Sequence, residues 1–146
     1  INIDPMHGLL PEHRVRVQDG LPFADNSIER VRASHVMEHI PQGAERIAAM
    51  NEIYRVLVPG GAFDMTVPLI GFDSGSGYQM VSGWWAWADP THVSQWVFPE
   101  SLLYFCEGPF RPHADYGIRI WDALSDDDWD VHGGWEGIAT LRKPRT

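Results

Sequence analysis

One stretch of the chain, residues 19–61, constrains the fold more than any other part of the sequence. A glycine and a Pro/Asp/Asn/Ser cluster first indicate a loop. The apolar residues that follow are typical of a short strand at 29–35 that ends in a polar corner: Ile28, Val31 and Ala33. Arg30 and Arg32 occupy the opposite face of this strand. A strand buried on both faces is nearly all apolar, so we expect helices to cover this face poorly.

A helix and a second strand follow the corner. Apolar residues recur at helical spacing from residue 44 to residue 57, with charged residues between them. Pro59, Gly60 and Gly61 should end this helix, because proline cannot continue it and glycine accepts a left-handed cap. An apolar strand is predicted at 62–67. A strand, a helix and a strand in this order predict a parallel pair of strands with a right-handed crossover.

Composition narrows the classes of function. The chain has 146 residues, enough for one domain with its own core. Its formal net charge of −9 argues against a surface that tracks nucleic-acid phosphates. The single cysteine, Cys106, rules out an internal disulfide and favours a reducing, cytoplasmic setting. No apolar run reaches the length of a membrane span, so we expect no membrane partner.

Three segments carry a resemblance: LPFADNSIE at 21–29, SHVMEHI at 34–40 and EIYRVLVPGGAFDMTVP at 52–68. In this order and spacing they resemble the class I S-adenosylmethionine-dependent methyltransferases, of the methyltransferase type 11-like kind. The likeness is strongest over residues 1–68. It implies an α/β, three-layer Rossmann-like fold with a mostly parallel sheet and a C-terminal antiparallel hairpin. The implied function is methyl transfer from S-adenosyl-L-methionine to an unidentified acceptor.

The resemblance also assigns cofactor-binding residues. By family position, Asp4 would bind the ribose of the cofactor. Asp19, Gly20 and Leu21 would frame the adenine, and His35 and Val36 at the strand corner would border the methyl donor. Local chemistry offers a simpler alternative for both acids, because aspartate commonly satisfies its own turn.

One element of the family is missing from this chain. A glycine-rich turn and the first strand normally precede the segment INIDP, and no G-x-G-x-x-G follows a strand here. We therefore expect residues 1–146 to be an N-terminally incomplete methyltransferase-like domain that by itself binds the cofactor weakly, if at all. The unpaired sheet edges predict a homodimer or a local rearrangement. The alternative function is a non-catalytic binding or assembly module.

Secondary structure outside the central stretch is predicted from shorter patterns. Alternating valines and arginines at 13–18 predict an edge strand, and a proline opens a short helix at 101–106. The tail predicts two strands, at 116–121 and 135–143. An acidic turn lies between them and lacks the ligand spacing of a calcium loop.

His35 to His39 match the zinc-peptidase pattern H-x-x-E-H. That chemistry needs both histidines on one face of a continuous helix. Here a strand ends at His35, and Pro41 follows His39 within two residues. We therefore expect no metal site from this motif.

Residues 69–98 form a Gly/Trp-rich insertion beside the expected acceptor site. Its aromatic residues are candidates for substrate binding: Tyr78, Trp84, Trp85 and Trp87. They are equally consistent with a core or a dimer contact. Asp89 and His92 lie three residues apart, so Asp89 is predicted to orient His92 as a general base. The simpler alternative is that Asp89 caps the turn and His92 packs against a tryptophan.

Overall fold

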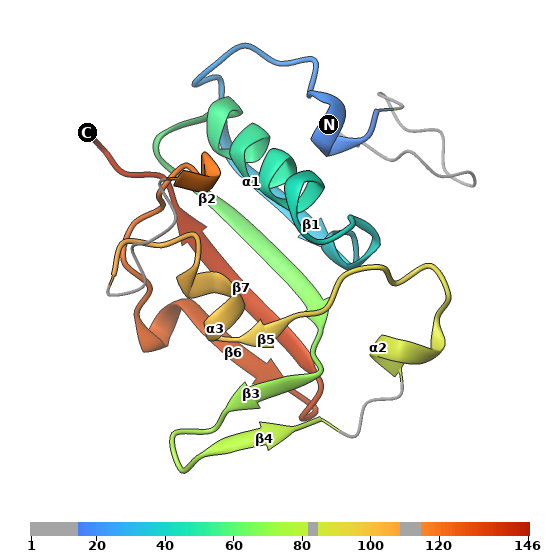
Figure 1. The fold of residues 1–146 in the computed structure, drawn as a ribbon. Coiled ribbons are helices and arrows are strands. Elements are labelled where there is room, and N and C mark those ends of the chain that lie inside the picture. Colours follow the sequence, from blue (N-terminus) through green and yellow to red (C-terminus); the bar gives the residue numbers. More distant parts are fainter. Residues whose placement is uncertain (1–14, 82–84, 109–114) are drawn as a thin grey trace.

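The structure is a computed structural model that describes residues 15–81, 85–108 and 115–146 (Figure 1). At Trp85 and Trp87 the description covers the backbone only. The main sheet has four strands, listed in spatial order: β1 (Ile28–Ser34), β2 (Leu57–Pro68), β7 (Glu136–Arg142) and β6 (Trp129–His132). A smaller sheet has three: β4 (Tyr78–Met80), β3 (Gly71–Asp73) and β5 (Val97–Phe98). The helices are α1 (Ala44–Val56), α2 (Trp85–Ala88) and α3 (Glu100–Leu103), with 3₁₀ turns η1 (Val17–Asp19), η2 (Met37–His39) and η4 (Asp126–Asp128).

The strand, helix and strand predicted for the central stretch are confirmed. β1 and β2 pair in parallel, and α1 connects them. The helical periodicity arises because one face of α1 is buried in the core: Ala49, Met50, Ile53 and Val56. The second strand begins earlier than predicted, at Leu57, directly after the helix. Gly60, with a φ of 80°, lies inside this strand and near a register shift, so the Pro-Gly-Gly segment bends the strand instead of separating it from the helix.

The rest of the main sheet is antiparallel. β7 pairs antiparallel with β2 and with β6, so the described sheet has one parallel pair and two antiparallel pairs. The C-terminal hairpin is confirmed, with Gly133 and Gly134 at positive φ in its turn. The strand predicted at 116–121 is wrong, because the partner of β7 is β6. Trp121 is fully buried and packs edge-on against Tyr54, so this segment covers the core and makes only one isolated bridge, to Cys106.

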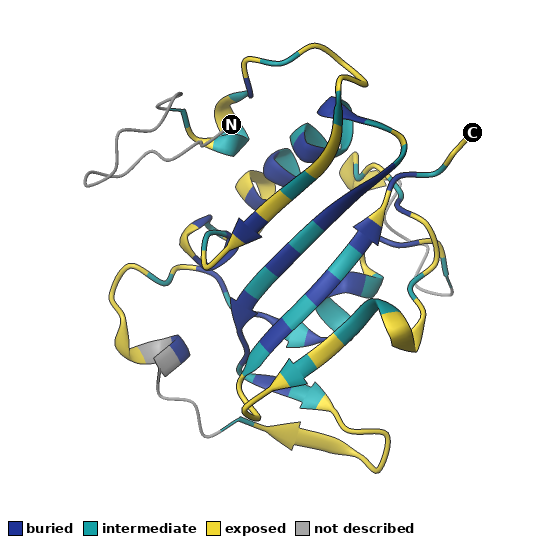
Figure 2. Cartoon of the chain, turned by 180° about the vertical axis from the view of Figure 1, so that it is seen from behind, coloured by how far each residue is buried: buried dark blue, intermediate teal, exposed yellow. Residues whose placement is uncertain are grey.

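The two faces of the main sheet differ. Val31, Phe63 and Leu141 lie in one row on the face that packs against the helices. Among the described elements, none lies over the other face (Figure 2). Arg32 on that face is exposed and is in register with Asp64. The predicted poor cover over residues 29–35 is therefore confirmed, and the described part of the fold has helices on one side only.

Two shorter predictions are corrected. Residues 15–18 are not part of an edge strand, because η1 forms there and an ion pair closes it, with 2.7 Å between Arg16 Nε and Asp19 Oδ2. The helix predicted at 101–106 is α3, which ends at Leu103. The remaining two residues of the predicted strand and the first residues of the chain lie outside the described ranges.

The insertion is more ordered than a loop. β3, β4 and β5 form the second sheet from it. Trp96 is fully buried, and the guanidinium of Arg46 lies 4.2 Å from its ring centroid. Burial lowers the pKa of Arg46 to about 10, so this residue stays charged near neutrality. Arg46 thereby attaches the end of the insertion to α1. In the described part of the chain, no helix is long and apolar enough to cross a membrane.

Candidate functional site

The corner at the end of β1 is held by backbone and side-chain contacts. His35 has a φ of 53°, and its N–H donates to the carbonyl of Thr66 at 2.9 Å. Its Nε2 lies 2.8 Å from Oε1 of Glu136, and its Nδ1 lies 3.2 Å from Oε1 of Glu38. The positive φ turns the chain sharply, so the side chains of the next residues leave the plane of the sheet. His35 thus lies at the strand tip, as predicted, between two carboxylates.

A groove of about 270 Å³ runs along the outer edge of β1. Leu21 and Val36 both line this groove. The other lining residues are mainly apolar: Val17, Phe23, Ile28, Val31, Ala33, Met37, Ile53, Val56, Arg30 and Arg32. Among the described residues, no strand pairs with this edge of β1. Two of the predicted cofactor residues, far apart in the sequence, therefore share one apolar groove.

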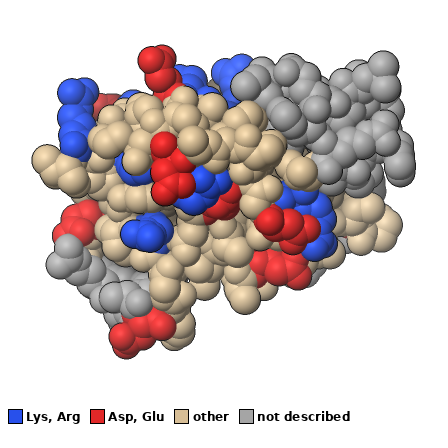
Figure 3. Space-filling model, turned by 90° about the horizontal axis from the view of Figure 1, so that it is seen from above, with Lys and Arg blue, Asp and Glu red and all other residues tan. Residues whose placement is uncertain are grey.

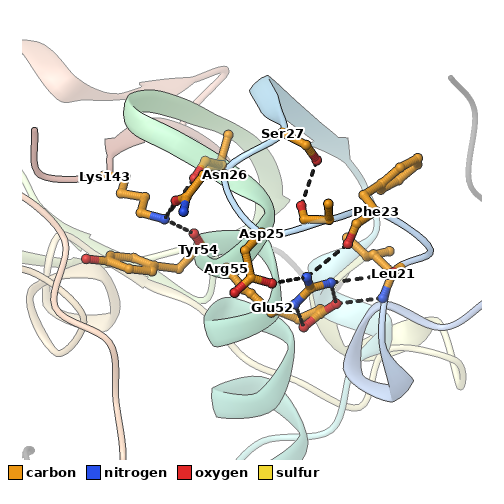
Figure 4. A network of polar contacts seen from close by, with 11 residues as sticks. Leu21, Phe23, Asp25, Asn26, Ser27, Glu52, Tyr54, Arg55 and Lys143 are labelled. Atoms are coloured by element: carbon orange, nitrogen blue, oxygen red, sulfur yellow. Dashed lines mark hydrogen bonds and ion pairs between the residues drawn. The ribbon is translucent and has the colours of Figure 1, made fainter.

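The loop that carries Leu21 is fixed to α1 by a polar network, called here the anchor cluster: Asp25, Glu52 and Arg55 with the backbone of Leu21 and Phe23 (Figure 4). The N–H of Leu21 donates to Glu52 at 2.7 Å, and Arg55 donates to the carbonyl of Leu21 at 3.2 Å. Arg55 also bridges Glu52 and Asp25, both at 2.6 Å. These bonds lower the pKa of Glu52, chiefly through its hydrogen bond to Arg55. Both backbone groups of Leu21 thus bond to side chains of α1, and its predicted place beside the adenine stays a prediction.

Lys143 fastens a second segment to the same end of α1 (Figure 4). Its ammonium donates to Asn26 Oδ1 at 2.7 Å and to the carbonyls of Tyr54 and Leu57 at 2.9 and 2.8 Å. The latter two carbonyls lie at the C-terminus of the helix, where cations are favoured. Burial lowers the pKa of Lys143. This residue joins the end of β7, the end of α1 and the loop before β1.

Asp19 and Gly20 lie apart from the groove. Asp19 is exposed and bonded to Arg16, and this hydrogen bond lowers the pKa of its carboxyl group. Gly20 has a φ of 111° and closes η1 through its N–H to the carbonyl of Val17. Neither residue lines the groove that Leu21 lines. Asp4 lies outside the described residues.

Asp89 mainly caps its own turn. Its Oδ1 accepts from the N–H of Thr91 at 2.8 Å and from the Thr91 hydroxyl at 2.6 Å. The hydrogen bond from the Thr91 hydroxyl is the main cause of the lowered pKa of Asp89. Its Oδ2 is 3.7 Å from Nε2 of His92, too long for a hydrogen bond. His92 packs edge-on against His39, with 4.9 Å between the ring centroids. The structure thus matches the simpler alternative for Asp89 and gives His92 a histidine neighbour.

Sequence reasoning missed a set of three side chains, called here the corner cluster: Glu38, His39 and His92. One ligand atom from each lies within 4.8 Å of the others. The N–H of Val93 donates to the carbonyl of Glu38 at 2.9 Å, which holds the loop beside η2. The available signal was the Glu-His pair in SHVMEHI and the histidine of ADPTH, but nothing local predicts that they meet.

Comparisons with known proteins give one matching family model and several similar solved structures. Residues 7–64 match the family model described as "Methyltransferase domain". The match covers 58 of the 146 residues of the chain. The class I methyltransferase resemblance is thereby confirmed, because the match covers the central strand and helix and the solved structures below have the same fold.

Three similar solved structures support the fold. A chain in the complex between the Trm112 methyltransferase activator of Haloferax volcanii and a candidate methyltransferase has a TM-score of 0.51 at 21% identity, covering 90% of this chain and 61% of that one. The [4+2]-cyclase SpnF has a TM-score of 0.54 at 20% identity, covering 90% and 55%. A candidate methyltransferase from Bacillus halodurans has a TM-score of 0.53 at 14% identity, covering 90% and 71%. At these identities the likeness shows the fold alone. None of the curated proteins matches the chain.

The aromatic candidates for the methyl acceptor are only partly described. Tyr78 on β4 is 49% exposed and lies over Gly71, and it does not line the groove. Trp84 lies outside the described residues, as do the side chains of Trp85 and Trp87. Substrate binding by these four residues stays a prediction of the methyltransferase family resemblance.

The surface charge is mixed on the face seen in Figure 3. Basic and acidic side chains alternate there, and neither sign forms a continuous patch. This pattern agrees with the net charge of −9 and with the ion pairs of the anchor cluster. The expectation that nucleic acid is not a partner of this chain stays a prediction.

Proposed function

We propose that the chain takes part in methyl transfer from S-adenosyl-L-methionine to an acceptor still to be identified. The observation that carries the proposal is the match of residues 7–64 to a methyltransferase domain. The matched residues include Leu21 and Val36, which share an apolar groove beside the strand corner. An apolar slot with few polar groups is the usual form of a site for a ring such as adenine.

The fold does not decide the reaction. One structural neighbour is a cyclase by name, so the same scaffold serves more than one chemistry. The chain also spans only 55–61% of the length of the first two solved structures that it resembles. Methyl transfer is therefore proposed for the whole protein that contains this chain, and the binding of the donor is proposed for this chain.

The residues of the chain would contribute mainly by binding and aligning the methyl donor. When bound, S-adenosyl-L-methionine supplies a methyl group on a sulfonium, which transfers by in-line displacement and depends on alignment. Leu21 and Val36 would contact the nucleoside through their side chains. His35, held against Glu136 at 2.8 Å, would keep the corner fixed beside the donor. Asp4, Asp19 and Gly20 remain proposed cofactor residues on the family resemblance alone.

A role for His92 as general base, with Asp89 as its partner, stays a prediction. Its support is that Nδ1 of His92 is buried and has no hydrogen-bond partner. The distance of 3.7 Å to Asp89 requires a small rotation before the carboxylate can hold the imidazole. A homodimer, or a protein partner such as the activator bound to the Haloferax volcanii neighbour, also remains proposed.

Calorimetric titration with S-adenosyl-L-methionine and with its demethylated product tests the donor half of the proposal. The titration uses this chain and the longest product of its coding sequence. Val36→Phe fills the groove, so we expect binding to weaken at least about tenfold, or about 1.4 kcal/mol. Val131→Phe is the matched control, since Val131 is also half-buried but lies on β6 away from the groove.

The possible results separate the alternatives. Saturable binding that Val36→Phe weakens and Val131→Phe leaves unchanged supports the proposal. The absence of saturable binding in both proteins would refute it, as would equal binding by the two variants. Transfer of labelled methyl from the donor into fractionated extract then identifies the acceptor class. Binding without transfer into any fraction would instead favour the non-catalytic module.

A further inference from the structure

We propose that the corner cluster, formed by Glu38, His39 and His92, is a binding site for a zinc-type divalent metal ion. The three residues come from η2 and from the distant loop after α2. One ligand atom from each lies within 4.8 Å of the others. Two imidazole nitrogens and one carboxylate oxygen form the ligand set of many catalytic zinc sites. The proposal concerns metal binding and is an alternative to the general-base role of His92, because both would use the free Nδ1 of this residue.

The carboxylate of Glu38 is the strongest evidence. Glu38 is 1% exposed, and neither of its carboxylate oxygens has a hydrogen-bond partner among the described residues. His35 Nδ1 lies 3.2 Å from Oε1 but does not meet the alignment of a hydrogen bond. Buried charged groups are normally paired, hydrogen-bonded or bound to a metal, because an uncompensated charge is costly to bury. A bound cation would compensate this carboxylate.

Each imidazole has one nitrogen suited to an outer partner and one to a metal. His39 Nδ1 lies 3.1 Å from the carbonyl of Thr91, which only accepts, so Nδ1 carries the proton and Nε2 carries the lone pair. His92 Nε2 faces Asp89 at 3.7 Å, and its Nδ1 is buried without a partner. Metal-binding histidines typically donate their other N–H to a carbonyl or carboxylate. The carbonyl of Thr91 fills this outer role for His39, and Asp89 would fill it for His92 after a small rotation.

The backbone brings the ligands together before any metal binds. The N–H of Val93 donates to the carbonyl of Glu38, and Arg46 donates to the Ser94 hydroxyl and, at 2.8 Å, to the carbonyl of Gln95. These bonds fix the three residues that directly follow His92 beside η2 and α1. Zinc–ligand distances of about 2.0–2.2 Å require ligand atoms about 3.4 Å apart in a tetrahedral site. Rotation of the partly exposed His39 and of His92 closes the remaining distance.

The ligand types select the ion. Calcium and magnesium prefer sites made of oxygen atoms, whereas imidazole suits zinc and its first-row neighbours. Three protein ligands leave a fourth position for water or a substrate atom. The site is distinct from the H-x-x-E-H arrangement, because His35 ends a strand and takes Glu136 as its partner. The second histidine comes from the ADPTH segment.

The test is zinc binding by the tag-free chain after treatment with a chelator and dialysis. Zn²⁺ is titrated in competition with a chromogenic chelator, and Co²⁺ absorption reports a four-coordinate site. We expect one Zn²⁺ per chain. Removal of an outer partner typically lowers metal affinity by roughly 10- to 100-fold, and we expect Asp89→Asn to lower the affinity for Zn²⁺ within that range. The loss should be larger than this in each of the three ligand variants: Glu38→Gln, His39→Gln and His92→Gln.

His132→Gln is the matched control, because His132 is an exposed histidine that also pairs with an aspartate, 3.0 Å from Asp130. It should bind Zn²⁺ like the unaltered chain. Circular dichroism of the metal-free variants verifies that each is folded, and the three ligand variants provide independent readings. Less than stoichiometric uptake by the unaltered chain would overturn the proposal. Normal uptake by Glu38→Gln, or an equal loss in His132→Gln, would overturn it too.

Discussion

Two polar clusters lie at opposite ends of the β1–α1 unit and are built differently. In the anchor cluster, Arg55 donates to two carboxylates and two backbone carbonyls, and Glu52 accepts from Arg55 and from the N–H of Leu21. In the corner cluster, both oxygens of Glu38 and Nδ1 of His92 have no hydrogen-bond partner among the described residues. A satisfied buried network stabilises the fold, whereas an unsatisfied one indicates a ligand. The comparison therefore assigns a structural role to the anchor cluster and supports the metal-binding proposal for the corner cluster.

The largest expected effect comes from removing the cation of the anchor cluster. Arg55→Met leaves Glu52, which is 15% exposed, without its partner and frees two loop carbonyls. We expect the free energy of unfolding to fall by about 2–3 kcal/mol, measured by denaturant titration. Arg30→Met is the matched control: Arg30 also pairs with an aspartate, Asp64, at 2.5 Å but is 59% exposed, so its loss should cost less than about 1 kcal/mol. Equal losses would remove the structural role of the anchor cluster.

Two matched glutamate substitutions, one in each cluster, compare the clusters directly. Glu52→Gln should lower the free energy of unfolding by about 1–2 kcal/mol, because a charge-assisted bond becomes a neutral one. Glu38→Gln, measured with chelator present, should leave the free energy of unfolding unchanged or raise it by about 1 kcal/mol, because a buried charge without a hydrogen-bond partner is removed. Urea unfolding of both variants measures the difference. A destabilised Glu38→Gln variant would indicate that Glu38 has a structural partner.

The smallest effect is the pH dependence of the anchor cluster. The folded-state pKa of Glu52 lies below its ordinary value of 4.5, mainly because of its hydrogen bond to Arg55. The carboxylate therefore stabilises the fold above pH 4.5, and this contribution is lost as the pH falls through the lowered pKa. Unfolding free energies measured from pH 7 down to pH 3 should fall less steeply in Glu52→Gln than in the unaltered chain. Parallel pH profiles would contradict this assignment.

The elements predicted well from the sequence are those with a local pattern. The helical periodicity of α1 and the alternation in β1 both arise from burial of one face, and both elements form where expected. Valine and arginine alternate at 15–17 too, but there the Arg16–Asp19 ion pair closes a turn instead. At 116–121, burial of Trp121 against Tyr54 takes the place of strand pairing.

The candidate site was harder to predict, because it depends on contacts between distant segments. His35 and Val36 were found at the strand corner, since the end of a parallel strand is a local feature. The meeting of His92 with Glu38 depends on Arg46 and on the backbone of Val93, which carry no periodic signal. The same holds for Leu21, whose backbone is taken by Glu52 on α1. Sequence patterns predict the helices and strands, whereas the contacts between distant segments determine which side chains lie together.

The position of β7 has a consequence for how the chain is made. β7 is the last strand of the described chain, yet it lies inside the sheet between β2 and β6, and Lys143 at its end bonds to the loop before β1 and to the C-terminal end of α1. During synthesis, β2 therefore presents an open edge until the residues of β7, Glu136–Arg142, have left the ribosome. Pairings over such long sequence separations form slowly, and exposed strand edges invite association in the meantime. The nascent chain is therefore expected to need protection by a chaperone until its final strand arrives.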